Sequence, residues 1–242
     1  LTGITASQIA NVSERSLPVV VEQSWTRQTS YVRKFFVESP TISEEDIKDS
    51  DVDILATNVQ DLVRAVARQV DIRIYNVITD NVSGTPFDGS TVTSAAATAD
   101  GWDDPATGDP IKDIMLGVTT IRNQSYDTTD LVMLLNPTDH SNLLQFLITV
   151  KGSSIPQFSS EKVKSGVVME LLGVRIVVSA NATTDYAVMF IPQRACSWKS
   201  FMPITSVTIK DEGIGTKIRV WEEGEAILTD PNAVYGITDT QV

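Results

Sequence analysis

The 242-residue sequence contains one cysteine, Cys196, and one histidine, His140. A single cysteine excludes an internal disulfide and a cysteine-based zinc site, and a single histidine excludes any metal site that needs several imidazoles. No apolar run reaches the roughly 18–20 residues of a membrane-spanning helix, and the N-terminus has no signal-peptide pattern. The sequence therefore gives no reason to expect a metal ion, a cofactor or a membrane partner.

Basic residues are also scarce, since 19 Lys and Arg face 31 Asp and Glu, a formal net charge of −12. This balance argues against a surface that wraps nucleic acid, which needs clustered Lys and Arg. It suits a wall that must not adhere to DNA, and it also simply favours solubility. A hydrophobic content of 42% and a charged content of 21% are ordinary for a globular protein with a sizeable core.

Residues 51–81 are predicted to form one long helix. Asp51 and Asp53 precede the helical pattern, where they can cap free N–H groups. Asp61 and Arg64 lie on the opposite face, at a spacing that allows an ion pair. At 1.5 Å per residue the helix would be roughly 45 Å long, so we expect it to act as a strut along which the fold is built. Its apolar stripe, with spacings of three or four residues, consists of Leu55, Val59, Leu62, Val66, Val70, Ile74 and Val77.

The first fifty residues contain too little core to fold alone. Residues 1–17 are interpreted as an arm, and residues 17–39 as a long hairpin of aromatic and β-branched residues. Arg33 and Lys34 on this hairpin are the kind of charge that protects a projecting strand from uncontrolled pairing. The acidic stretch that follows is interpreted as an extended lead-in to the long helix.

The middle of the chain alternates helix and strand. A solvated loop is predicted at 82–110, because its acidic residues lack the spacing of a calcium loop. A second amphipathic helix is predicted at 110–125, and a buried strand at 131–135. Thr138 or Asp139 is predicted to cap the helix that follows.

The last third of the sequence is rich in strand patterns. A strand pair is predicted at 167–179 and single strands at 186–191 and 233–237. Clean alternation around 207–228 indicates two strands joined by a turn at Gly213 and Gly215, with Gly224 at a turn or bulge. The fold class predicted from the whole pattern is α+β.

Each candidate for chemistry has a simpler structural interpretation. The run 139–141 holds Asp, His and Ser, but consecutive helical residues project in different directions and cannot form a relay. Glycines 213 and 215 are followed by a strand, not by the helix that a dinucleotide site requires. The glutamates at 222, 223 and 225 are interpreted as a solvated charge cluster, and Cys196 as a small buried hydrophobe. No catalytic residue is assigned, which favours a structural building block.

Four passages, in order, resemble the major capsid proteins of tailed double-stranded DNA phages, whose shared architecture is often called the Hong Kong phage fold. The first is the long helix, DVDILATNVQDLVRAVARQVDIRIYNVITDN, similar to the family's spine helix. The second is DPIKDIMLGVTTIRNQSYDTTDLVMLLNPTDHSNLLQFL, with a strand that ends in Asn-Pro before a helix. The third is MELLGVRIVVS, in which Arg175 stands where the family commonly has Pro. The fourth is the closing TKIRVWEEGEAILTDPNAVYGITD.

The resemblance implies a division of the chain and a set of contacts. Residues 1–50 would form an N-terminal arm and an extended hairpin, the E-loop. Residues 51–110 and 206–242 would form a peripheral domain on the spine helix 51–81, and residues 111–205 an axial domain. Because an extended ribbon with little core can bury its side chains on another chain, we expect a subunit interface at Trp25, Tyr31, Arg33, Lys34, Phe35 and Phe36.

The function implied is that of a major capsid protein in a virion, which self-assembles into an icosahedral shell enclosing viral double-stranded DNA without sequence-specific binding. Hexamers and pentamers of one polypeptide would form in the host cytoplasm, with scaffold, portal and decoration proteins as possible partners. Because the sequence begins at Leu1, proteolytic loss of a leading segment is a further expectation. An encapsulin-like compartment shell is the alternative within this fold. From a different class, a virion-associated binding module or an enzyme with an α/β core predicts a compact monomer or a small oligomer.

Overall fold

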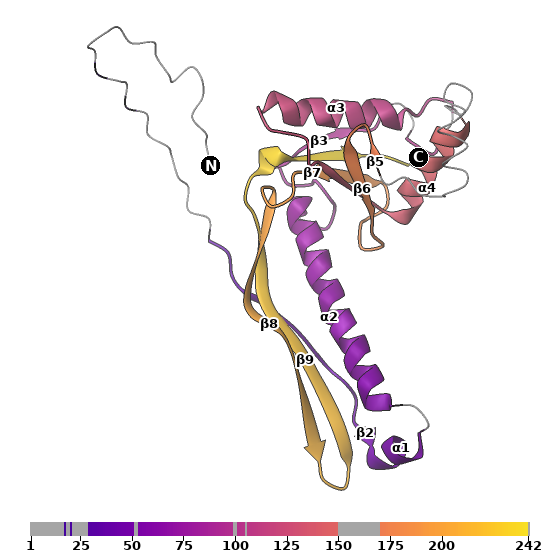
Figure 1. The fold of residues 1–242 in the computed structure, drawn as a ribbon, viewed down its shortest axis with the longest axis vertical. Coiled ribbons are helices and arrows are strands. Elements are labelled where there is room, and N and C mark those ends of the chain that lie inside the picture. Colours follow the sequence, from indigo (N-terminus) through magenta and orange to yellow (C-terminus); the bar gives the residue numbers. More distant parts are fainter. Residues whose placement is uncertain are drawn as a thin grey trace. The chain divides into compact units, whose positions relative to one another are not determined.

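The computed structural model describes residues 17, 20, 29–50, 53–98, 101–104, 106–149 and 170–241. The chain divides into two compact units, Leu1–Tyr31 and Val32–Val242. In the first unit only residues 17, 20 and 29–31 are described, and the Tyr31 side chain is 84% exposed. The predicted arm and most of the predicted hairpin, including Trp25, lie outside the described residues. All elements named below belong to the second unit (Figure 1).

The long helix α2 spans Ile54–Ile78, 25 residues, and is therefore shorter than the predicted 51–81. Asp53 is its N-cap and accepts a hydrogen bond from the Ala56 N–H at 3.0 Å, as predicted. The helix stops where the Thr79 hydroxyl donates to the Tyr75 carbonyl and Asp80 adopts a left-handed φ of 47°. At 1.5 Å per residue α2 is about 38 Å long, so it keeps the proportions of a strut.

A short helix, α1 at Glu44–Asp49, corrects the prediction of an extended acidic lead-in. Ser43 caps it by accepting a hydrogen bond from the Asp46 N–H at 3.0 Å. The acidic residues that follow Ser43 occupy the first turn, where the positive end of the helix dipole favours them. The same charges that suggested a solvated linker therefore stabilise a helix start.

One antiparallel sheet forms a long ribbon beside α2 (Figure 1). Its two main strands, β8 at Cys196–Asp211 and β9 at Gly215–Leu228, are joined by the predicted turn. On the other side of β9 lie β1 at Arg33–Glu38 and β2 at Ile42–Ser43. Of the hairpin predicted at 17–39 the structure describes one strand, β1, and its partner is β9, almost two hundred residues away.

Helix α2 covers one face of this ribbon with the apolar stripe predicted from the sequence. The contacts there form one cluster in which Val66, Ile218 and Val220 are buried. From β1, Phe35 and Val37 pack against the same cluster. The predicted stripe is confirmed in this part of the helix, and the surface pair is confirmed by a 3.5 Å contact between Arg64 and Asp61.

The second sheet has six strands in the order β3-β10-β7-β4-β6-β5. β10 pairs in parallel with β3 and β4 in parallel with β6, while the other pairs are antiparallel. Helices α3 (Pro110–Asn123) and α4 (Pro137–Thr149) pack against one face, and the C-terminal end of α2 packs against the other. The strands are β3 (Thr93–Ala96), β10 (Val234–Thr238), β7 (Tyr186–Phe190), β4 (Val132–Leu135), β6 (Val174–Val178) and β5 (Glu170–Leu171).

The segment 82–110 is not the plain solvated loop that was predicted. It contributes strand β3 to the sheet, and its Trp102 is buried with the indole N–H donating to Asp113 at 2.9 Å. The Asp88 carboxylate accepts hydrogen bonds from the N–H groups of Val82 and Ser83. The hydrogen bond from the Ser83 hydroxyl, together with these backbone bonds, lowers the Asp88 pKa to about 2. The segment is therefore an ordered part of the fold.

Helix α4 starts two or three residues earlier than predicted. Pro137 is its first residue, and the Asn136 side chain before it accepts a hydrogen bond from the Thr138 N–H at 3.0 Å. Proline suits this position because the first helical N–H has no partner inside the helix. Neither Thr138 nor Asp139 is therefore the cap, and Asp139 is buried within the helix.

Candidate subunit interface

The residues of β1 that were predicted to lie at an interface are divided between the two faces of the strand. Phe35 points toward the interior, where its ring lies 6.4 Å from that of Trp198. Lys34 and Phe36 occupy the opposite face, in register with Glu223 and Trp221 of β9. Phe35 is therefore already packed inside its own chain, whereas Phe36 remains 52% exposed and is available for a contact.

The outer face of the ribbon combines aromatic rings with one neutralised cation. The Phe36 and Trp221 rings lie 6.5 Å apart, and the Lys34 ammonium stands over both at 5.7 and 5.6 Å. Lys34 also pairs with Glu223 at 3.1 Å. Because the cation is matched by a carboxylate and by two ring faces, this surface can lose its water at lower cost than an unpaired lysine could.

A buried carboxylate ties β1 to the long helix. Glu225 on β9 is 5% exposed at its side chain, and its two oxygens contact Arg33 of β1 at 3.0 Å and Arg73 of α2 at 2.7 Å. This corrects the prediction that 222, 223 and 225 form a solvated cluster. The local sequence does not indicate that Glu225 is buried while its neighbours are more exposed, because its partner Arg73 is 152 residues away.

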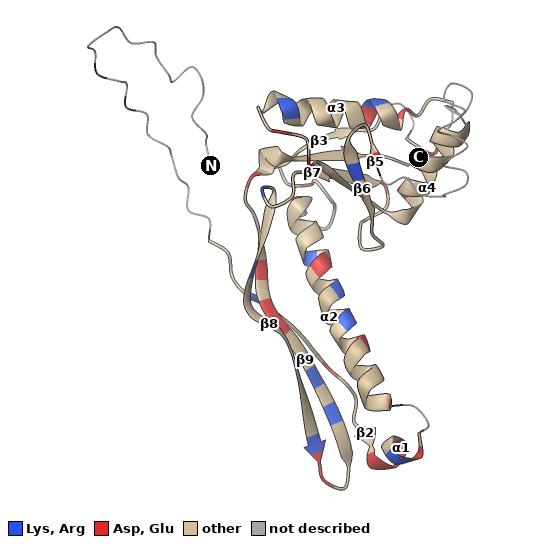
Figure 2. Cartoon of the chain, viewed as in Figure 1, with Lys and Arg blue, Asp and Glu red and all other residues tan. Residues whose placement is uncertain are grey.

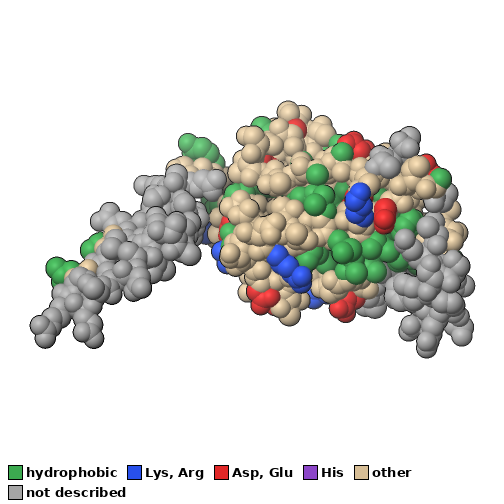
Figure 3. All heavy atoms as spheres, turned by 90° about the horizontal axis from the view of Figure 1, so that it is seen from above, with side chains coloured by type: hydrophobic (Ala, Val, Ile, Leu, Met, Phe, Trp, Pro, Cys, Tyr) green, Lys and Arg blue, Asp and Glu red, His purple; other side chains and the backbone are tan. Residues whose placement is uncertain are grey.

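A second area of apolar surface lies on the domain of the six-stranded sheet. In Figure 3, hydrophobic side chains gather in one area flanked by basic and acidic ones. Helix α3 lies at the top of Figure 1, on the side from which Figure 3 is seen. Its Met115 and Leu116 are about half exposed, so this helix face is also open to a contact.

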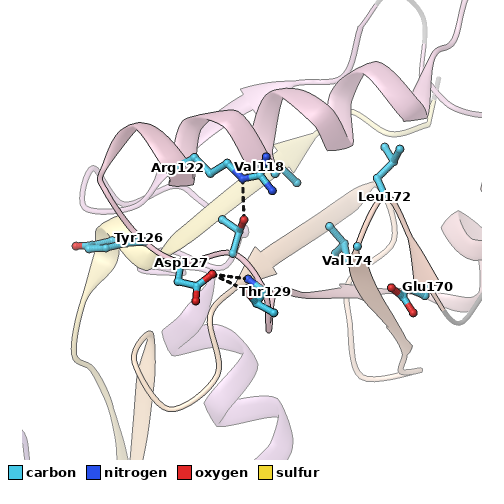
Figure 4. Close-up of a pocket in the computed structure, with 10 residues that line it drawn as sticks. Val118, Arg122, Tyr126, Asp127, Thr129, Glu170, Leu172 and Val174 are labelled. Atoms are coloured by element: carbon cyan, nitrogen blue, oxygen red, sulfur yellow. Dashed lines mark hydrogen bonds between the residues drawn. The ribbon is translucent and has the colours of Figure 1, made fainter.

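A groove of about 520 Å³ lies between α3 and the β5–β6 turn (Figure 4). Arg122 donates to the Thr128 hydroxyl at 2.8 Å, and Asp127 accepts from the Thr129 N–H at 3.0 Å. The hydrogen bonds from Thr129 lower the pKa of Asp127. Glu170 lies at the far end of the groove from Arg122 in Figure 4. Arg122 and Asp127 are therefore both engaged in hydrogen bonds to threonines of the segment that follows α3, and we assign this groove no catalytic role.

The other candidates for chemistry are structural as well. The Asp139 carboxylate accepts hydrogen bonds from the Thr240 hydroxyl and the Gln241 side chain, both at 2.8 Å, and burial raises its pKa. Burial also raises the pKa of the Cys196 thiol, opposite to what a nucleophilic thiol needs. Among the described residues, no three of His, Cys, Asp and Glu are grouped as metal ligands would be. None of the described helices is both long and apolar enough to cross a membrane.

The fold, a long helix beside a β ribbon joined to a domain with a mixed six-stranded sheet, is similar to that of solved phage capsid structures. A chain from Mycobacterium phage Che8 matches with a TM-score of 0.66 and 18% identity, over 87% of this chain and 72% of that one. The capsid structure of cyanophage P-SCSP1u matches with a TM-score of 0.67 and 15% identity, over 90% and 80%. A virus-like particle from Pyrococcus furiosus matches with a TM-score of 0.59 and 13% identity, over 86% and 76%.

The chain belongs to the phage capsid protein family, whose model matches residues 41–237. It is a structural protein of a capsid shell, it assembles into a multimeric shell, and its place is the virion. A comparison with curated proteins gave no match. The predicted α+β capsid fold is thereby confirmed.

Proposed function

We propose that copies of this chain form hexamers and pentamers that close into an icosahedral shell around packaged double-stranded DNA. The observation that carries this is the ribbon of β1, β8 and β9, which α2 covers on one face while the outer face presents Phe36 and Trp221 without a covering element in the described part of the chain. A formal net charge of −12 supports a wall that encloses DNA without gripping it.

Within this proposal the interface is formed by the segment that ends in β1. Lys34 and Phe36 would make the direct contacts, together with Tyr31 and the undescribed Trp25. Arg33 and Phe35 would hold β1 in place from behind, through Glu225 and the core below α2.

The domain division is also part of the proposal. The six-stranded sheet with α3 and α4 would be the axial domain, and α2 with the ribbon the peripheral domain. The predicted boundaries at 110 and 206 place β3 and β10 in the peripheral domain, whereas both strands pair into the sheet that also holds β4 and β7. A division that follows the two sheets keeps the strands of each sheet together in one domain.

Further partners and the cellular site follow from the same role. Assembly would take place in the host cytoplasm, with scaffold, portal and decoration proteins joining the shell. The role is structural, and we assign no enzymatic activity. An encapsulin-like shell around cargo protein is the second candidate, because the virus-like particle from Pyrococcus furiosus has a similar fold.

Electron microscopy of the purified protein, with sedimentation velocity, tests the proposal. Closed shells or uniform pentamers and hexamers are the expected result, and nuclease-protected DNA inside particles isolated from cells would select a phage capsid over a compartment for protein cargo. A monomer that stays monomeric at high concentration would contradict it. A binding module or enzyme is the class that such a monomer would indicate.

A further inference from the structure

Strand β8 contains two irregularities that the long ribbon does not need for its own pairing. The register with β9 shifts between Ser200 and Met202 and again between Met202 and Thr205. Each shift places an additional residue on β8, which is a β-bulge. Bulges re-aim side chains, and the first one turns Phe201 outward, where it is 73% exposed.

The consequence is a run of four apolar residues that are all exposed, Phe201, Met202, Pro203 and Ile204. Such a run on a surface strand is unfavourable unless it is used, because it promotes aggregation. Proline at its centre removes one backbone donor from this edge strand, and this limits pairing with other strands. The surface therefore favours side-chain contact over strand addition.

These residues continue into the outer face of β1 and β9. A shallow hollow of about 290 Å³ separates Phe201 from Val32 and is also lined by Lys34 and Glu223. The Trp221 indole N–H donates to the Met202 sulfur at 3.0 Å, which joins the aromatic pair to the bulge. We name this surface the bulge patch; it consists of Val32, Phe36, Phe201, Met202, Ile204 and Trp221.

The charge distribution indicates what can approach the bulge patch. Strands β1, β8 and β9 carry six Lys and Arg against five Asp and Glu, although the chain as a whole has a formal net charge of −12. Figure 2 shows both blue and red residues along the ribbon, and mostly red ones on α1. A ribbon with balanced charge adds little repulsion where two acidic copies meet, so a second copy is the partner that this surface fits best.

We propose that the bulge patch is a docking surface for a second copy of this chain, with Phe201 as the anchoring side chain. This rests on the proposed function, since it assigns one contact within the shell. A bulge that presents one exposed aromatic ring beside a hollow has the features of an interface anchor. The neutral Lys34–Glu223 pair lets the surrounding surface lose its water without leaving an unpaired charge.

The test compares Phe201→Ser with Val82→Ser in the full-length protein. Val82 is equally apolar, is 76% exposed and lies in the loop after α2, outside the bulge patch. We expect both variants to keep the wild-type melting temperature, because neither side chain supports the core. Phe201→Ser should raise the critical concentration for assembly by at least about tenfold, and Val82→Ser should leave it unchanged.

A photo-reactive benzoylphenylalanine in place of Phe201 then identifies the occupant. Irradiated shells should yield a covalent product of twice the chain's mass. If the product joins position 201 to residues 1–31 of the same chain, or if no cross-link forms, the docking proposal is wrong although the capsid function stands. If the wild-type protein never assembles, the proposed function and the docking surface both fail. If Phe201→Ser assembles as the wild type does, only the docking surface fails.

Discussion

Glu225 offers the sharpest test of how the ribbon and the long helix are held together. Glu225→Gln removes the charge from a side chain that is 5% exposed and faces two arginines. Losing one partner of a buried ion pair costs about 3–5 kcal/mol, because the remaining charge stays buried without compensation. The Arg33 side chain is 58% exposed, so water can solvate its charge once the carboxylate is lost. The Arg73 side chain is only 23% exposed, so most of the free-energy cost comes from leaving its charge without a partner.

We therefore expect Glu225→Gln to lower the free energy of unfolding by about 2–3 kcal/mol. For a chain of this length that corresponds to a melting temperature lower by roughly 5–10 °C. Urea unfolding would be measured on dilute subunits, with sedimentation to confirm that no shells are present, because assembly stabilises the folded state.

Glu223→Gln is the matched control. It removes the partner of Lys34, which is 54% exposed, so this pair is worth less than about 1 kcal/mol. In a double-mutant cycle with Arg73→Gln, a coupling of at least about 1 kcal/mol is expected for Glu225. Equal losses for Glu225→Gln and Glu223→Gln, or additive effects in the cycle, would refute the view that the buried carboxylate joins β1, β9 and α2.

Three further predictions follow from individual contacts. Gly224→Ala should destabilise the subunit by about 1–3 kcal/mol in urea unfolding, because a Cβ there would lie 2.4 Å from the Trp198 ring; unchanged stability would contradict this packing. Asp139→Asn should gain stability relative to wild type as pH rises above the ordinary carboxyl pKa of 3.8, because burial raises the pKa of Asp139 in the folded state and its ionisation destabilises the wild-type fold. Free energies of unfolding that change with pH in parallel for the two proteins would show that the pKa of Asp139 does not change on folding. Asp53→Ala should cost about 1 kcal/mol and speed hydrogen exchange at the Ala56 amide, since the cap is lost; an unaltered exchange rate would argue against the cap.

Periodicity predicted the parts of this fold that depend on neighbouring residues. The stripe of α2 and the start of α3 at Pro110 could be derived from the spacing of apolar residues and from the proline, and the structure adds the Asp109 cap. The turn between β8 and β9 likewise follows from Gly213, whose φ of 77° favours glycine. Each of these features is fixed within a few residues of chain, where sequence patterns carry physical information.

The remaining features depend on contacts between distant segments. β3 has the sequence TSAA, which has no strand pattern, and pairing with β10 makes it a strand. β1 was assigned as a strand but not to its partner, since nothing local distinguishes β9 from a closer strand. Of the predicted interface residues, Lys34 and Phe36 share the outer face, and no pattern indicated that Phe201 lies beside them, because its exposure arises from a register shift.

The position of β10 has a consequence for the order in which the protein is made. This strand contains residues 234–238, well over a hundred residues after β3, yet it lies between β3 and β7 in the six-stranded sheet. During translation β3 can pair with its neighbour only after β10 has left the ribosome, so the six-stranded sheet stays incomplete until then. A product that terminates before β10 therefore lacks the strand that joins β3 to β7, and it exposes apolar surfaces that quality-control proteases recognise. Only chains that extend through β10 have the finished sheet for shell building.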